Sequence, residues 1–163
     1  YINDPTTFSA SVTSTTGNFD SVIALFNDGG YGLYGNDDAK LGFGDAGLPA
    51  GSLLGPQASG WYHLAVFSIA TAPTSGNDTT PANWIAPETS FPFTSIISAS
   101  GPGGASPLTG WAPVEHLETL NEEYTIGLAS VSVVPEPETY AMLLAGLGLM
   151  GAMARRRKVF TAY

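Results

Sequence analysis

The strongest constraint on the fold is an uncharged apolar run of fifteen residues near the C-terminus, from Tyr140 to Ala154. As an α-helix this run would rise about 1.5 Å per residue and reach roughly 22 Å. That length is short against a hydrocarbon core of about 30 Å, and apolar runs only slightly shorter usually form buried helices of soluble domains. The choice between a buried helix and a membrane segment therefore depends on the residues that flank the run.

The flanks favour a membrane segment. Pro135-Glu136-Pro137 precedes the run, and its prolines disfavour helical geometry, so this stretch is expected to be stiff and exposed. Four basic residues, 155–158, follow the run, and their side chains can extend to the membrane interface. We therefore predict a single C-terminal transmembrane helix at about 139–157. The positive-inside bias predicts residues 159–163 as a short cytoplasmic tail and the domain before the helix as exported.

The order of these three parts resembles the PEP-CTERM sorting signal of Gram-negative bacteria. The resemblance covers residues 134–158, and its motif residues are Pro135, Glu136, Pro137, Arg155, Arg156 and Arg157. It implies export, anchoring in the inner membrane, and processing by an exosortase near the Pro-Glu-Pro stretch. It also implies a location at the cell surface or outside the cell, with a link to exopolysaccharide and biofilm matrix.

The charge of the chain is distributed unevenly. Residues 1–154 contain all fourteen acidic residues and one basic residue, Lys40, which gives a net charge of −13. Such a surface repels phosphate backbones, so we expect no nucleic-acid partner. Acidity either keeps an exported surface soluble or attracts divalent cations. The absence of cysteine excludes Cys-ligated zinc, iron–sulfur clusters and Cys nucleophiles.

Short β-prone stretches between Gly-rich turns predict an all-β domain over residues 1–133, with a β-sandwich or jelly-roll architecture. Asn27-Asp28-Gly29-Gly30 is typical of a hairpin turn. Residues 71–93 and 100–113 are rich in Pro, Gly, Ser and Thr and are expected to be loops. The expected strands lie at residues 8–13, 22–26, 31–34, 50–54, 60–68, 94–98 and 124–131.

The N-terminal part carries a second resemblance. This part resembles a bacterial pre-peptidase C-terminal domain in the order of five stretches: Phe19 to Phe26, Gly29-Gly30, Asn36-Asp37-Asp38, Ala50-Gly51 and residues 60–66. Domains of that family are small β-sandwiches appended to secreted proteins. The resemblance implies a non-catalytic accessory module that in some members binds calcium.

Asn36-Asp37-Asp38 is the stretch that points most directly to a metal. Adjacent carboxylates and an amide in a turn are hard oxygen ligands of the kind that calcium prefers. Asp28 is expected across the proposed hairpin, and we predict a calcium site formed by Asp28, Asn36, Asp37 and Asp38. Asp45 follows in the next loop. The alternative is that these residues only cap turns through bonds to their own backbone.

The remaining residues favour a binding or structural module over an enzyme. Trp84 and Trp111 fall in expected loops and are candidates for a sugar-stacking surface, or else they plug the ends of the β core. The sequence has no Gly-x-Ser-x-Gly, His-Glu-x-x-His or phosphate-loop motif. We expect a non-enzymatic module that binds polysaccharide, calcium or further copies of itself. Two alternatives stay open: a polysaccharide-acting hydrolase, whose paired carboxylates need no local motif, and a structural surface protein without a ligand.

Overall fold

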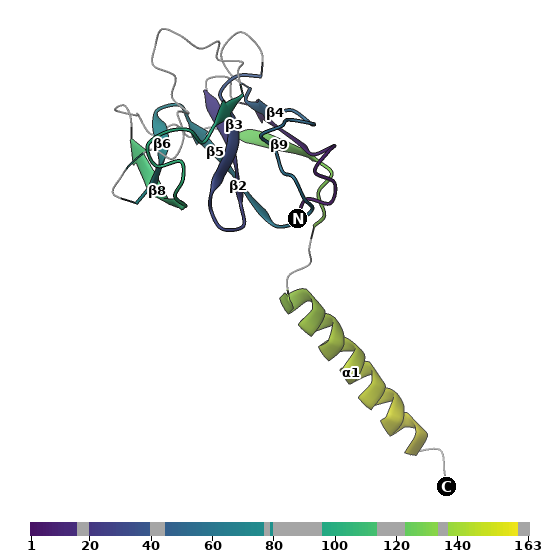
Figure 1. The fold of residues 1–163 in the computed structure, drawn as a ribbon. Helices are drawn as coiled ribbons and strands as arrows, with labels where there is room; N and C mark the ends of the chain where they lie inside the picture. The colour runs from purple at the N-terminus through teal and green to yellow at the C-terminus, as the bar shows by residue number, and fades with distance from the viewer. Residues whose placement is uncertain are drawn as a thin grey trace. The chain divides into compact units, whose positions relative to one another are not determined.

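The computed structural model describes residues 1–15, 20–39, 45–76, 79, 96–113, 123–133 and 137–159. The chain divides into two structural units, Tyr1–Ser132 and Val133–Tyr163. The first is built from strands, and the second contains the helix α1, Pro137–Val159 (Figure 1). A mostly β chain with a C-terminal helix is therefore confirmed.

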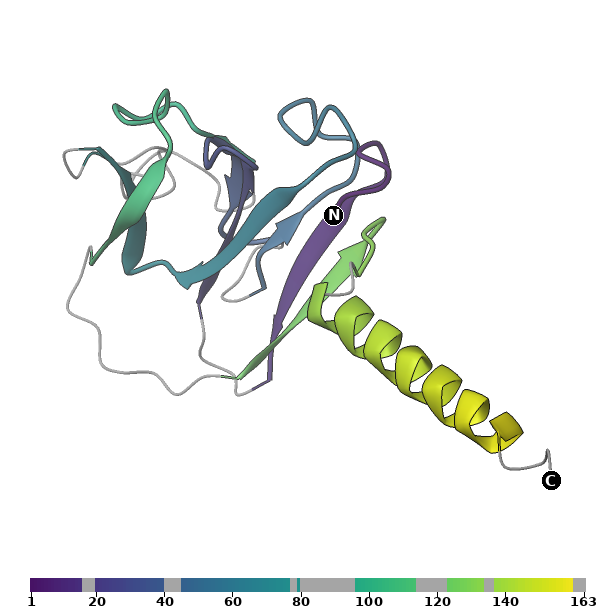
Figure 2. The ribbon, with the colours of Figure 1, turned by 90° about the horizontal axis from the view of Figure 1, so that it is seen from below.

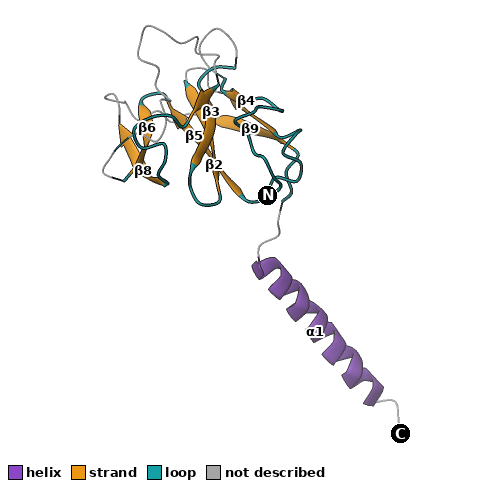
Figure 3. Ribbon diagram, viewed as in Figure 1, coloured by secondary structure: helices purple, strands orange, loops and turns teal. Residues whose placement is uncertain are grey.

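The first unit contains three sheets, where a β-sandwich or jelly roll predicts two (Figure 3). The strand orders are β4-β1-β9, β5-β2-β3-β7 and β6-β8, and every pairing is antiparallel. The strand bounds are β1 Ser9–Ser14, β2 Ser21–Asn27, β3 Gly32–Asn36, β4 Gly47–Leu48, β5 Tyr62–Ser68, β6 Thr71–Ser75, β7 Ile97–Ser98, β8 Leu108–Pro113 and β9 Tyr124–Ala129.

Strand β2 is buried on both of its faces. Ile23 and Leu25 belong to one core, which β2 shares with the β4-β1-β9 sheet. Val22, Ala24 and Phe26 belong to a second core, on the side of the β6-β8 sheet (Figure 2). Successive side chains of a strand point to opposite faces. A strand that is covered on both sides therefore has to be continuously apolar, and residues 22–26 are.

Strand β1 is buried on one face only. Ala10 and Val12 point into the first core, whereas Ser9 and Ser11 lie on the outer face of the sheet. This alternation is the period-two pattern that predicted the strand. On the outer face a Cβ on Gly127 would lie 2.8 Å from the Ser11 Oγ, so a larger residue there would force the serine hydroxyl to rotate away.

The β2–β3 hairpin forms where the sequence predicts it. The amide of Gly30 donates to the Asn27 carbonyl oxygen at 2.9 Å, and Gly30 has a φ of 81°, which glycine adopts without strain. The register pairs Ile23 with Asn36 and Leu25 with Tyr34. The residues just before β2 and just after β3 therefore meet at the end of the hairpin opposite the turn.

Three expectations about strands and loops are wrong. Residues 50–54 form turns rather than a strand, and Leu53 is 95% exposed; the strand of this region is the two-residue β4. Residues 71–75 and 108–113, expected in loops, pair as β6 and β8. Proline lacks a donor and is tolerated in edge strands. Pro73 fits because a two-stranded sheet consists of edges alone.

Helix α1 begins two residues earlier and ends two residues later than predicted. Its first residue is Pro137, a position that proline favours because the first-turn amides have no acceptor within the helix. Within the described residues, no helix combines the length and the apolar character needed to cross a membrane. The transmembrane assignment of this helix is therefore unconfirmed.

Candidate functional site

Three aspartates meet at the end of the β2–β3 hairpin opposite the turn. Asp20 directly precedes β2, and Asp37 and Asp38 directly follow β3. One carboxylate oxygen of each residue lies within 4.8 Å of those of the other two. We call this set the acidic cluster. Its geometry follows from the antiparallel register of β2 and β3, which brings the two ends of the hairpin together.

The acidic cluster is shielded from solvent. Asp37 is 6% exposed and Asp38 is 7% exposed, while Asp20 is half-buried. The Oδ1 atom of Asp37 is buried and has no hydrogen-bond partner among the described residues. A buried polar atom without a partner is rare and costs free energy comparable to a lost hydrogen bond.

Burial also changes how these carboxyl groups titrate. Desolvation, together with the charges of Asp20 and Asp38, raises the pKa of Asp37 to about 7. Desolvation and the neighbouring Asp38 raise the pKa of Asp20 as well. Both shifts have the sign expected when a charged form loses water and faces like charges. The acidic cluster therefore brings like-charged carboxyl groups together in a place with little water.

Nearby polar side chains have structural partners. The Asn36 Oδ1 accepts a hydrogen bond from the Gly47 amide at 3.1 Å, and the Ser21 Oγ accepts one from the Ala46 amide at 3.2 Å. The Asp45 Oδ1 accepts one from the Ser14 amide at 3.0 Å. These bonds hold the segment that contains β4 against β1, β2 and β3.

The structure brings together only part of the predicted calcium site. Asp37 and Asp38 lie side by side with Asn36 next to them in the chain, but Asp28 is exposed in the turn at the other end of the hairpin. The residue that completes the acidic cluster is Asp20, which sequence reasoning missed. Because Ile23 pairs with Asn36, continuing the register places positions 37 and 38 opposite 22 and 21, and Asp20 is the next residue along. The signal that could have found Asp20 is therefore the pairing of the two hairpin strands.

Only one of the two tryptophans predicted to bind ligand can be located, since Trp84 lies outside the described residues. Trp111 is in strand β8 and not in a loop. It is 44% exposed, and its ring packs on Phe67 with 5.0 Å between the centroids. Trp61 is 52% exposed and makes an edge contact with Tyr1. Each indole therefore combines a structural contact with an exposed surface.

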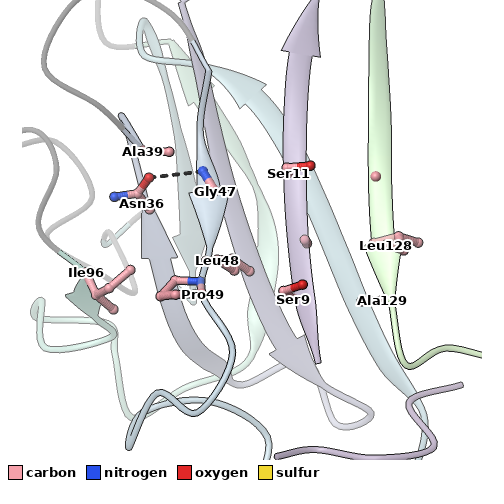
Figure 4. A pocket seen from close by; sticks show the side chains of 12 residues that line it. Ser9, Ser11, Asn36, Ala39, Gly47, Leu48, Pro49, Ile96, Leu128 and Ala129 are labelled. Atoms are coloured by element: carbon pink, nitrogen blue, oxygen red, sulfur yellow. Dashed lines mark hydrogen bonds between the residues drawn. The ribbon is translucent and has the colours of Figure 1, made fainter. Parts of the chain in front are cut away.

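A groove of about 550 Å³ lies over the outer face of the β4-β1-β9 sheet (Figure 4). Ser9 and Ser11 of β1 line it, with Leu128 of β9 on one side and Ile96 and Pro49 on the other. The Asn36–Gly47 hydrogen bond borders it. The lining holds hydroxyl groups and apolar surface, and none of its residues is charged.

The sorting residues lie at the two ends of α1. Pro137 begins the helix, and Arg155, Arg156 and Arg157 lie in its last turns, with Arg155 exposed. Pro135 and Glu136 lie outside the described residues. The apolar side chains described between them are all exposed: Met142, Leu143, Leu144, Leu147, Leu149, Met150 and Met153.

Comparison with protein families identifies this segment. Residues 133–158 match the family model described as the PEP-CTERM protein-sorting motif. The C-terminal segment is a PEP-CTERM motif. The PEP-CTERM motif indicates an exported protein that is processed by an exosortase. No curated protein matches the chain, and no solved structure does. The resemblance of the N-terminal part to a pre-peptidase C-terminal domain is not confirmed.

Proposed function

We propose that the β unit is a non-enzymatic component of the cell surface or of the exopolysaccharide and biofilm matrix, delivered there by its PEP-CTERM motif. The observation that carries this proposal is that the β unit ends where the PEP-CTERM motif begins. The β unit ends at Ser132, and the PEP-CTERM motif begins at residue 133. Processing within the motif would therefore leave every strand of the β unit in place.

Helix α1 is proposed to hold the precursor transiently in the inner membrane. Its described apolar side chains are exposed, and an exposed apolar surface of this kind is unfavourable in water. The apolar stretch is short, but arginine side chains can extend from a helix end toward the interface. Arg155 and its basic neighbours would stay on the cytoplasmic side, with the β unit outside.

Two features support a binding role rather than a catalytic one. Trp111 exposes part of its indole, and aromatic faces are suited to stacking on apolar ligand surfaces. In the β unit His63 pairs with Phe26 near the hairpin turn, whereas the acidic cluster lies at the other end of β2. His63 is therefore not positioned to act with these carboxylates as a general acid or base.

The sorting proposal predicts a processing defect from one substitution. In a bacterial host that has an exosortase, we expect Glu136→Gln to accumulate as precursor, because the charge between the two prolines is part of the recognition stretch. Glu138→Gln removes the same charge two residues later and is the matched control, expected to be processed like the wild type. Immunoblots of membrane and extracellular fractions measure the ratio of precursor to processed protein. Equal processing of both variants would contradict the assignment of Glu136.

The matrix proposal predicts loss of polysaccharide binding from Trp111→Ala. Removing one stacking face is worth roughly 1 kcal/mol, so binding to purified exopolysaccharide should weaken by about fivefold to tenfold. Trp61→Ala removes another half-exposed indole and should bind normally. The melting temperature checks that loss of the Phe67 contact has not unfolded the unit. Unchanged binding, or release of reducing sugar by the wild type, would favour the structural or the hydrolase alternative respectively.

A further inference from the structure

We propose that Asp20, Asp37 and Asp38 bind one divalent cation, with calcium as the preferred ion, at the end of the β2–β3 hairpin opposite its turn. This site differs from the one predicted from the sequence, since Asp20 takes the place of Asp28. It does not depend on the matrix role proposed above, and it would stand if that role were wrong.

The spacing of the carboxylate oxygens fits calcium. Calcium–oxygen distances are about 2.3–2.6 Å, so two oxygens on one calcium ion lie at most about 5 Å apart. The ligand oxygens of the acidic cluster lie within 4.8 Å of one another. The separations therefore stay below the distance that one calcium ion can span, and its flexible coordination by carboxylate oxygens suits this ligand set.

A second observation points to a ligand and not merely to a group of acids. Asp37 is more than nine-tenths buried, and its Oδ1 has no hydrogen-bond partner among the described residues. A carboxylate oxygen buried in this way needs a proton, a donor or a cation. A cation supplies the missing partner and at the same time reduces repulsion between three like charges.

The surrounding hydrogen bonds fix the site before an ion arrives. Asn36 and Ser21, which adjoin the acidic cluster in the chain, accept bonds from the amides of Gly47 and Ala46. The Asp20 carbonyl oxygen accepts a bond from the Ile69 amide at 3.2 Å, which ties the start of β2 to the end of β5. The chain next to the ligands is therefore held by two other segments, residues 46–47 and Ile69, and binding requires little ordering of the backbone.

The test uses the full chain in mild detergent, stripped of metal with EDTA and desalted. Calorimetric titration with calcium chloride should show one ion per chain. Saturating calcium should raise the melting temperature by about 5–10 °C, and magnesium chloride should give a smaller rise. Asp37→Asn and Asp20→Asn should lose the response. Asp28→Asn removes an exposed carboxylate at the far end of the same hairpin and should keep it.

The proposal would be overturned by a wild-type chain that shows neither heat nor a melting shift with calcium. It would equally be overturned if Asp20→Asn and Asp37→Asn bound calcium as Asp28→Asn does, since the ion would then occupy another part of the acidic surface. Circular dichroism confirms that each variant is folded. Asp20 is less buried than Asp37, so Asp20→Asn provides the comparison if Asp37→Asn does not fold.

Discussion

In the presence of a chelator at pH 7 and above, Asp37→Asn will be more stable than the wild type. The wild-type side chain is buried beside Asp20 and Asp38 and has to ionise there, whereas asparagine occupies the same volume without charge. We expect a gain of about 1–3 kcal/mol in the free energy of unfolding. With calcium present the order should reverse, because only the wild type gains stability from the ion.

The same group gives stability a pH dependence with a definite sign. The pKa of Asp37 is about 7 in the folded chain and near its ordinary value of 3.8 in the unfolded chain. Between these values the folded state holds a proton that the unfolded state has lost, so stability in EDTA falls as pH rises from about 4 to 7. A shift of this size corresponds to at most roughly 4 kcal/mol. The free energy of unfolding of Asp37→Asn should depend less on pH than that of the wild type.

Urea unfolding of the full chain in EDTA, at several pH values from 4 to 8, measures both effects. Asp28→Asn is the control, and its curve should run parallel to that of the wild type. If Asp37→Asn were less stable than the wild type in EDTA at pH 7, the Asp37 carboxylate would be making a favourable interaction. The description of its Oδ1 as a buried atom without a hydrogen-bond partner would then be wrong.

Phe26→Ala will be the most destabilising of the simple core truncations. Phe26 is fully buried in the second core, which also contains Val22, Ala24 and Phe67. Loss of a buried phenylalanine side chain leaves a cavity and costs about 3–5 kcal/mol. Leu53→Ala removes an exposed apolar side chain and should change stability by less than about 0.5 kcal/mol. Urea unfolding monitored by circular dichroism gives both values.

A cost below about 1 kcal/mol for Phe26→Ala would mean that the β6-β8 side of β2 does not form a close-packed core. Stability in that case would rest on the first core alone. Leu25→Ala, on the opposite face of the same strand, tests that core separately.

The strands that could be predicted are those in which each residue carries a clear burial signal. The continuously apolar β2, the alternating β1 and the hairpin turn at residues 27–30 all lie where the sequence places them. Strand β4 has two residues, too few for any period to appear. Strands β6 and β8 contain proline and glycine, which normally indicate loops, and they form because each provides the other with a partner.

The candidate metal site was half predictable for a related reason. Asp37 and Asp38 are adjacent in the chain, so the local sequence is enough to predict them as metal ligands. Asp20 joins them only through the β2–β3 register, which is a property of two strands and not of a local motif. The burial of Asp37 could not be foreseen, because it depends on packing between segments that are distant in sequence.

Strand β1 is completed by β9, the last strand among the described residues. Its six residues pair with β9, about 115 residues further along the chain, and the short β4 covers only two of them. Contacts of such long sequence separation form slowly and cannot form before both strands are present. While the chain leaves the ribosome and crosses the membrane, β1 therefore lacks its main partner strand. The β4-β1-β9 sheet can form only after β9, just before the PEP-CTERM motif, has emerged. Until then the chain cannot complete its fold, and an incompletely folded chain is easier to translocate.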